Sequence, residues 1–153
     1  EMCIRDSFII SIIMSLLFKN FKMVLISLIP NIIPLIIAGG IMGYFNIPLK
    51  PSSALVFSIV FGISVDYSIH FLAKFKNELL SKSLEDSIIN TINQTGRSMI
   101  FTSFILFFGF IIFAFSNFGG TIVLGVLTSI ILFVAMITNL TLLPSIILYF
   151  YKK

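Results

Sequence analysis

The sequence predicts an all-α protein: a polytopic bundle of transmembrane helices, made of the end of one span and four full spans, with a short cytoplasmic amphipathic helix. Of the 153 residues, 58% are hydrophobic, the mean hydropathy is +1.14, and only 10% are charged. A soluble domain of this length cannot bury so much apolar surface, so the lipid bilayer is the expected surrounding. The formal net charge of +4 lies in short loops between apolar runs. This placement indicates membrane orientation and not nucleic-acid binding.

The apolar runs give the order of the spans. One helix is expected to end over residues 8–18, and full spans follow over residues 23–45, 54–75, 98–115 and 121–149. Roughly 17–25 apolar residues suffice for a helix to cross the hydrocarbon core. Residues 1–7 carry charges of both signs and are treated as a doubtful leader that need not be native. Residues 8–153 then form one transmembrane domain.

The first full span contains two features that shape helix packing. Pro30 and Pro34 each lack a backbone donor, so a kink is expected there, with Asn31 placed to bond freed carbonyls. Gly39 and Gly43 lie four residues apart and form a face of small residues, which lets a neighbouring helix approach closely.

A polar connection separates the second and third full spans. Ser83, with Asp86 three residues later, has the pattern of a helix-capping box. Apolar residues then recur at helical spacing up to Gly96, which is expected to end the segment. We therefore expect a short amphipathic helix that lies on the membrane surface.

Basic residues set the orientation. If the spans alternate, one side of the membrane receives Lys19, Lys22, Lys74, Lys76, Lys82, Arg97, Lys152 and Lys153. Apart from the leader, the other side receives only Lys50. The positive-inside rule then places the amphipathic helix and the C-terminus in the cytoplasm. The expected location is the inner or plasma membrane of the cell.

Asp66 is the most informative residue, because an Asp at the centre of a transmembrane helix costs roughly 2.5–3.5 kcal/mol on insertion. His70 and Gly62 lie one turn after and one turn before it, so the three share a helix face, and Tyr67 lies beside that face. Asp and His each bind and release a proton, and such groups at different depths predict a proton path. The alternative is that Asp66 only hydrogen-bonds a neighbouring helix.

No catalytic constellation is evident. The chain has one histidine, one cysteine (Cys3), no Gly-rich phosphate loop and no carboxylate pair with acid/base spacing. We therefore expect no enzyme activity, no metal site and no cofactor other than protons as the coupling ion. On the next span, Thr102 and Ser103 are candidate supports that orient the proton-binding groups.

Several motifs in one order resemble the resistance–nodulation–division superfamily, in its branch of MmpL-type lipid and hydrophobe exporters. The central match is Gly62-xxx-Asp66-Tyr67-xx-His70-Phe71. Upstream of it lies Leu28-Ile29-Pro30-Asn31-Ile32-Ile33-Pro34, and downstream lie Gly96-Arg97-Ser98, Phe101-Thr102-Ser103 and Leu142-Leu143-Pro144. The resemblance covers the chain from residue 8 to its end.

This resemblance implies the second-half membrane domain of a larger two-half transporter. Asp66 would be the proton-binding group and Tyr67 its hydrogen-bond partner, and this pair would meet an equivalent pair in the missing N-terminal half. The histidine at position 70 also fits the pattern found at this position in many relatives. Near Asn139 the family often has an acidic residue, so a secondary polar contact is expected to be weaker here.

The favoured hypothesis is that the chain is part of a proton-driven exporter of lipids or other hydrophobic cargo. Asp66, Tyr67 and His70 would form its proton relay. Two alternatives share this architecture: a sterol-sensing-like, lipid-binding regulatory module, and an accessory subunit of the protein-export translocon. The relay residues favour the pump, because a sensor needs no proton path. Whether the protein forms a homo-oligomer is left open.

Overall fold

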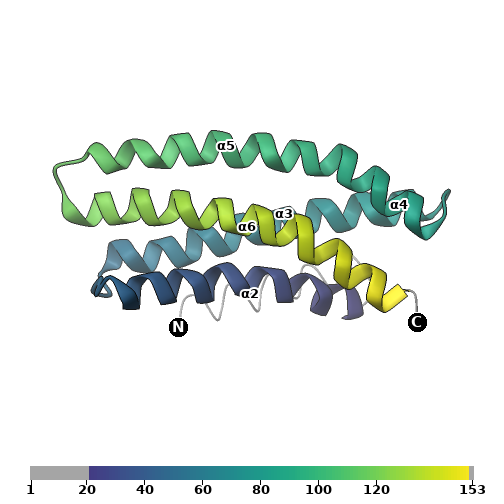
Figure 1. Ribbon diagram of the computed structural model, residues 1–153, viewed down its shortest axis with the longest axis horizontal. Helices are drawn as coiled ribbons and strands as arrows, with labels where there is room; N and C mark the ends of the chain where they lie inside the picture. The colour runs from purple at the N-terminus through teal and green to yellow at the C-terminus, as the bar shows by residue number, and fades with distance from the viewer. Residues whose placement is uncertain (1–20, 152–153) are drawn as a thin grey trace.

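The structure is a computed structural model that describes residues 21–151, and within them it contains helices joined by turns (Figure 1). In order, these elements are α2 (Phe21–Tyr44), α3 (Pro51–Leu79), α4 (Leu84–Thr91), η1 (Ile92–Gly96), α5 (Arg97–Ile111), η2 (Ile112–Phe115) and α6 (Gly119–Tyr151). Four helical stretches are long and apolar enough to cross a membrane: Ile26–Tyr44, Pro51–Leu79, Leu84–Phe115 and Gly119–Phe150. The prediction of an all-α bundle with four full spans is confirmed.

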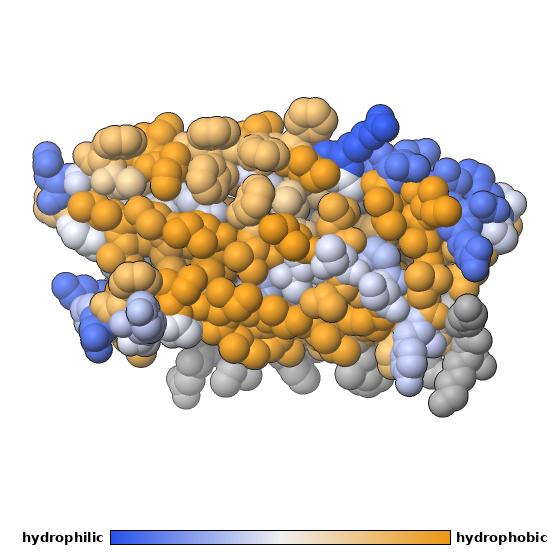
Figure 2. Space-filling view, in the orientation of Figure 1, coloured by the Kyte–Doolittle hydropathy of each residue, from blue (hydrophilic) through white to orange (hydrophobic). Residues whose placement is uncertain are grey.

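Hydrophilic residues gather at the two ends of the bundle and hydrophobic residues cover its middle (Figure 2). One end holds the α2–α3 and α5–α6 turns. The other holds the α3–α4 turn and the C-terminus (Figure 1). The leader 1–7, the expected helix end over 8–18 and Lys152-Lys153 lie outside the described residues.

Helix α6 is the centre of the bundle, because it packs against α2, α3 and α5. Two apolar clusters form the core. The cluster nearer the α3–α4 turn includes Phe71, Phe75 and Leu143, and the one nearer the α2–α3 turn includes Val60, Ile131 and Leu132. Helix α5 is the most open of the spans, with large exposed side chains that include Phe101, Ile105 and Phe108.

Helix α2 runs without interruption through Pro30 and Pro34. The side-chain amide of Asn31 donates to the Ser27 carbonyl oxygen at 2.7 Å. The carbonyls that the two prolines leave without a helical donor belong to Ile26 and Pro30, four residues before each proline. Asn31 therefore bonds a carbonyl next to a freed one, and the predicted kink stays a prediction.

Several helix boundaries differ from the predicted ones, and the differences at Pro51 and Gly96 have a clear physical reason. Helix α3 begins at Pro51, three residues early, because proline at the first helical position has a preset φ and needs no donor. The predicted cap at Ser83 is confirmed, since its hydroxyl accepts from the Asp86 amide. The predicted helix end at Gly96 is wrong, because α4 continues through the π-helical turn η1 into α5.

Gly96 has right-handed helical dihedral angles, with φ of −60° and ψ of −40°. A Cβ atom added there would lie 2.9 Å from Leu140 Cδ1 on α6. The missing side chain thus leaves room for the tip of the Leu140 side chain, which reaches η1 from α6. The sequence alone could not distinguish this use from a helix terminator.

Candidate functional site

Asp66 and His70 lie together on the open face of α3. His70 Nε2 is 3.4 Å from Asp66 Oδ1, and the side chains are 69% and 62% exposed in this chain. Gly62 lies one turn before them, and a Cβ added to it would meet no atom within 4 Å. The predicted shared face therefore exists, and residues 26–150 leave it uncovered.

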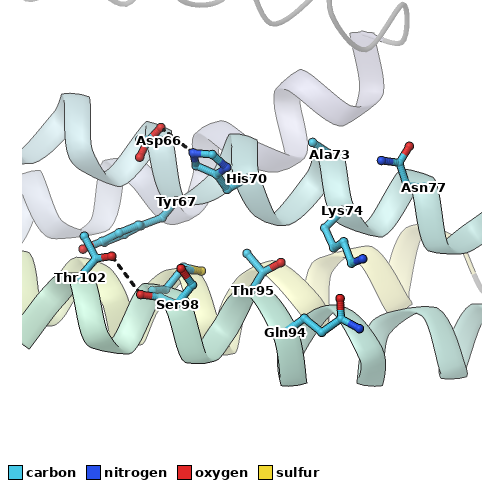
Figure 3. Close-up of a pocket in the computed structure, with 11 residues that line it drawn as sticks. Asp66, Tyr67, His70, Ala73, Lys74, Asn77, Gln94, Thr95, Ser98 and Thr102 are labelled. Carbon is cyan, nitrogen blue, oxygen red and sulfur yellow. Dashed lines mark hydrogen bonds and ion pairs between the residues drawn. The ribbon is translucent and has the colours of Figure 1, made fainter.

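Tyr67 points the other way, toward α5 (Figure 3). It is 3% exposed, and its hydroxyl lies 2.7 Å from the Ser103 hydroxyl. Ser103 is thus the polar partner that the structure gives Tyr67, whereas the family resemblance implied Asp66. Of the two predicted supporting residues on α5, Ser103 reaches Tyr67. Thr102 instead donates to the Ser98 carbonyl of its own helix at 2.9 Å.

A polar cleft separates α3 from η1 and α5, and Asp66 lies at its inner end (Figure 3). The cleft has a volume of about 490 Å³ and is lined by Asp66, Tyr67, His70, Ala73, Lys74, Asn77, Gln94, Thr95, Ser98, Met99 and Thr102. From Asp66 to Asn77 it follows α3 for about 16 Å, at ~1.5 Å per residue. It ends near the α3–α4 turn, which the sequence predicts to be cytoplasmic.

Ion pairs fix the charged side chains at this outer end. Glu78 is 2.9 Å from Lys74 and 2.7 Å from Lys82, one turn away on either side. Lys74, the lysine that lines the cleft, is therefore held toward Glu78 and away from Asp66.

A second polar group, which the sequence analysis did not assemble, lies on the opposite face of α3. We call it the amide–hydroxyl cluster; it consists of Asn31 on α2, Ser64 and Ser68 on α3, and Asn139 on α6, all with no exposed surface. Asn31 Oδ1 accepts from Ser64 Oγ at 2.7 Å, Ser68 Oγ at 3.1 Å and Asn139 Nδ2 at 3.2 Å. Ser68 Oγ also lies 2.6 Å from Asn139 Oδ1, and Asn139 Nδ2 lies 3.0 Å from Ser64 Oγ.

Two signals in the sequence point to this cluster. Ser64 and Ser68 are four residues apart and so share a face, and Asn31 and Asn139 each interrupt an apolar span. Polar groups in hydrocarbon need partners, so isolated amides in separate spans are candidates to meet one another. Asn139 itself makes several hydrogen bonds, and whether they are weaker than the contact of an acidic residue at this position stays a prediction.

The glycines singled out for packing are open in this chain. A Cβ added to Gly39 or Gly43 would meet no atom within 4 Å, as at Gly62. Their close-packing role therefore stays a prediction for a helix outside residues 21–151. In that range no group of three or more His, Cys, Asp and Glu side chains is placed to hold a metal ion.

The model of one protein family, described as the MMPL family, matches residues 4–152. The chain belongs to the MMPL family. It is also similar to the "Putative membrane protein MJ1562" of Methanocaldococcus jannaschii, with 29% identity over 143 residues. That match covers 90% of this chain and 36% of the relative, so the chain spans little more than a third of the relative's length. No solved structure matches the chain.

Membership in the MMPL family agrees with the motifs around Asp66 and with the four spans, and it makes the chain a multi-pass membrane protein. The amide–hydroxyl cluster and the polar cleft are then features of an MMPL membrane domain. They lie on opposite sides of its helix α3.

Proposed function

We propose that this chain is part of a proton-driven membrane transporter that exports lipids or other hydrophobic compounds, and that Asp66 binds the coupling proton. The proposal rests on the position of Asp66, an intramembrane carboxylate at the inner end of a polar cleft. Its Oδ1 atom lies 3.4 Å from His70 Nε2. Ionisable residues inside membrane spans typically mark ion or proton paths.

The cleft supports a route for the proton. Polar side chains line it from Asp66 to Asn77, including Thr95, Ser98 and Gln94 on the facing wall. Lipid tails cannot hydrogen-bond these groups, whereas water can. In the proposed cycle Asp66 takes up one proton, becomes neutral, and releases it toward the α3–α4 end. His70 stabilises the carboxylate while the proton is absent.

Tyr67 and Ser103 have a supporting role in this proposal. Their hydroxyl pair joins α3 to α5 next to Asp66, so a change in charge at Asp66 acts on a helix held to α5 at that point. Thr102 lines the cleft beside Asp66 and so faces the same water.

We further propose that the open face of α3 meets the other half of the same transporter. Gly62 on α3 leaves room for the close approach of another helix, as Gly39 and Gly43 do on α2, and a Cβ added at any of the three would meet no atom within 4 Å. In the proposed orientation the protein spans the inner or plasma membrane, with the C-terminus and the α3–α4 turn in the cytoplasm. The lipid or hydrophobic cargo class rests on the resemblance to MmpL-type exporters.

The test compares the intact transporter with its Asp66→Asn variant at equal membrane levels. Export of the cargo is measured with and without a proton uncoupler. The control is Glu85→Gln, which also neutralises a carboxylate, at an exposed position of α4 outside the cleft. We expect Asp66→Asn to lower export to the level seen with uncoupler and Glu85→Gln to leave export unchanged.

Continued export by a properly inserted Asp66→Asn variant would refute proton binding at Asp66. That result would favour the sterol-sensing-like regulatory module, which needs no proton relay. Proton uptake by proteoliposomes gives a second readout that does not depend on knowing the cargo.

A further inference from the structure

The amide–hydroxyl cluster occupies the junction between the two apolar clusters of the core. On α3 it lies between Val60 of one cluster and Phe71 of the other, and on α6 between Leu132 and Leu143. Its four side chains come from three helices, so it ties α2, α3 and α6 at a single level of the bundle. No other described set of side-chain hydrogen bonds joins three helices.

The geometry of α3 relates this cluster to Asp66. Each residue turns an α-helix by about 100°, so Asp66 lies about 200° from Ser64, and His70 lies about 200° from Ser68. Two serines held on the inner face therefore place the two titratable groups on the outer face. The exposed fractions in the structure agree, since Ser64 and Ser68 have no exposed surface and Asp66 and His70 are more than half exposed.

We propose that Asn31, Ser64, Ser68 and Asn139 are positioning residues that set the rotation of α3 and thereby hold Asp66 and His70 in the polar cleft. Apolar packing alone does not fix this angle strongly, because the lipid-facing and protein-facing sides of a span are both apolar. A hydrogen-bonded amide cluster fixes the rotation of α3 more strongly, because rotating the helix leaves buried polar groups without partners in hydrocarbon. The link to proton binding rests on the proposed function, whereas the rotation itself does not.

The experiment measures the rotation directly in the intact transporter with Cys3 replaced by Ser. Single cysteines are placed at Asp66 in the cleft and at Val65, which is 3% exposed. A small water-soluble methanethiosulfonate is added from the α3–α4 side, and the two labelling rates are compared. The proposal predicts that Cys at position 66 reacts and Cys at position 65 is protected.

Asn139→Leu removes the α6 member and keeps the number of side-chain heavy atoms and the branching at Cγ. We expect the ratio of the two labelling rates to fall about twentyfold, the size of change that losing the three interhelical side-chain hydrogen bonds of Asn139 to Asn31, Ser64 and Ser68 produces at average membrane strength. The matched control is Thr128→Val on the same helix, since the buried Thr128 hydroxyl has no hydrogen-bond partner among the described residues. This control is expected to leave the ratio unchanged.

A second variant separates positioning from general stability. Replacing all four members with apolar residues, Asn31→Leu, Ser64→Ala, Ser68→Ala and Asn139→Leu, removes the unpaired partners that make the single change destabilising. We expect this variant to insert and fold better than Asn139→Leu and still to have the lowered labelling ratio. The conservative Asn139→Gln, which keeps the amide, is expected to restore part of the ratio.

Two results would overturn the proposal. One is a labelling ratio in the four-fold apolar variant equal to that of the unaltered transporter. The other is protection of Cys at position 66 in the unaltered transporter. Neither result bears on whether Asp66 carries a proton, because labelling is independent of export. Conversely, an export-competent Asp66→Asn variant would refute the proposed function and leave the rotation result standing.

Discussion

Replacing Gly125 with alanine is expected to disturb the contact between α6 and the end of α5. Gly125 is buried on α6, and a Cβ added there would lie 2.6 Å from Phe113 Cβ and 2.7 Å from the Phe110 carbonyl oxygen. Ordinary contact begins near 3.4 Å, so the chains must separate by about 0.8 Å. The obstructing atoms belong to the backbone and to a Cβ, which no rotamer change can move.

The size of the effect follows from two opposing terms. Overpacking a well-packed site typically costs about 1–3 kcal/mol. Alanine also favours the helix over glycine by up to about 1 kcal/mol. Gly109→Ala on α5 isolates this second term, because a Cβ added at Gly109 would meet no atom within 4 Å. The difference in stability between the two variants then reports the overpacking cost alone.

The assay is thermal unfolding of the purified protein in detergent, followed by the far-ultraviolet circular dichroism of its helices. We expect Gly109→Ala to match or exceed the parent and Gly125→Ala to be less stable than Gly109→Ala by about 1–3 kcal/mol. That difference corresponds to several degrees in Tm. Equal stability of the two variants would show that the contact of α6 with η2 is not as close as the structure has it.

Two further predictions concern the site. Tyr67→Phe and Ser103→Ala should each lower stability by about 0.6–1.7 kcal/mol, the range of interhelical hydrogen bonds in membranes. A double-mutant cycle that finds no coupling between the two residues would contradict their hydrogen bond. In the Cys3→Ser background, a cysteine replacing Thr102 in the cleft should react with a water-soluble thiol reagent several times faster than one replacing the neighbouring exposed Phe101. Equal rates would mean that water does not fill the cleft.

The spans could be predicted from sequence because apolar length alone decides whether a helix crosses the bilayer. Which face of each helix packs against its neighbours could not be predicted from the sequence. In lipid both the outward and the inward side of a span are apolar, so periodicity says little about which side packs. Gly39 and Gly125 look equally suited to close packing in the sequence, yet an added Cβ would clash only at Gly125.

In the candidate site, too, some contacts could be predicted from the sequence and others could not. Asp66 and His70 meet because a helix brings residues four apart together whatever its neighbours do. The partners of Tyr67 and Ser64 depend on the register of α3 against α5, α2 and α6, which no local pattern specifies. The continuation of α4 into α5 was missed for a related reason, since Gly96 serves a contact with α6 and not the end of its own helix.

Neutral and ionisable polar side chains lie on different faces of α3. The groups sealed between helices, Ser64 and Ser68, are hydroxyls that meet neutral amides, and a closed set of hydrogen bonds satisfies them. The ionisable groups, Asp66 and His70, line the cleft, where water can replace missing partners. The reverse arrangement would bury a charge in the bundle core, where an ion without a partner costs several kcal/mol. The two proposals therefore assign holding the helix and carrying the charge to opposite faces of α3, and they predict that a substitution on one face need not impair the chemistry of the other.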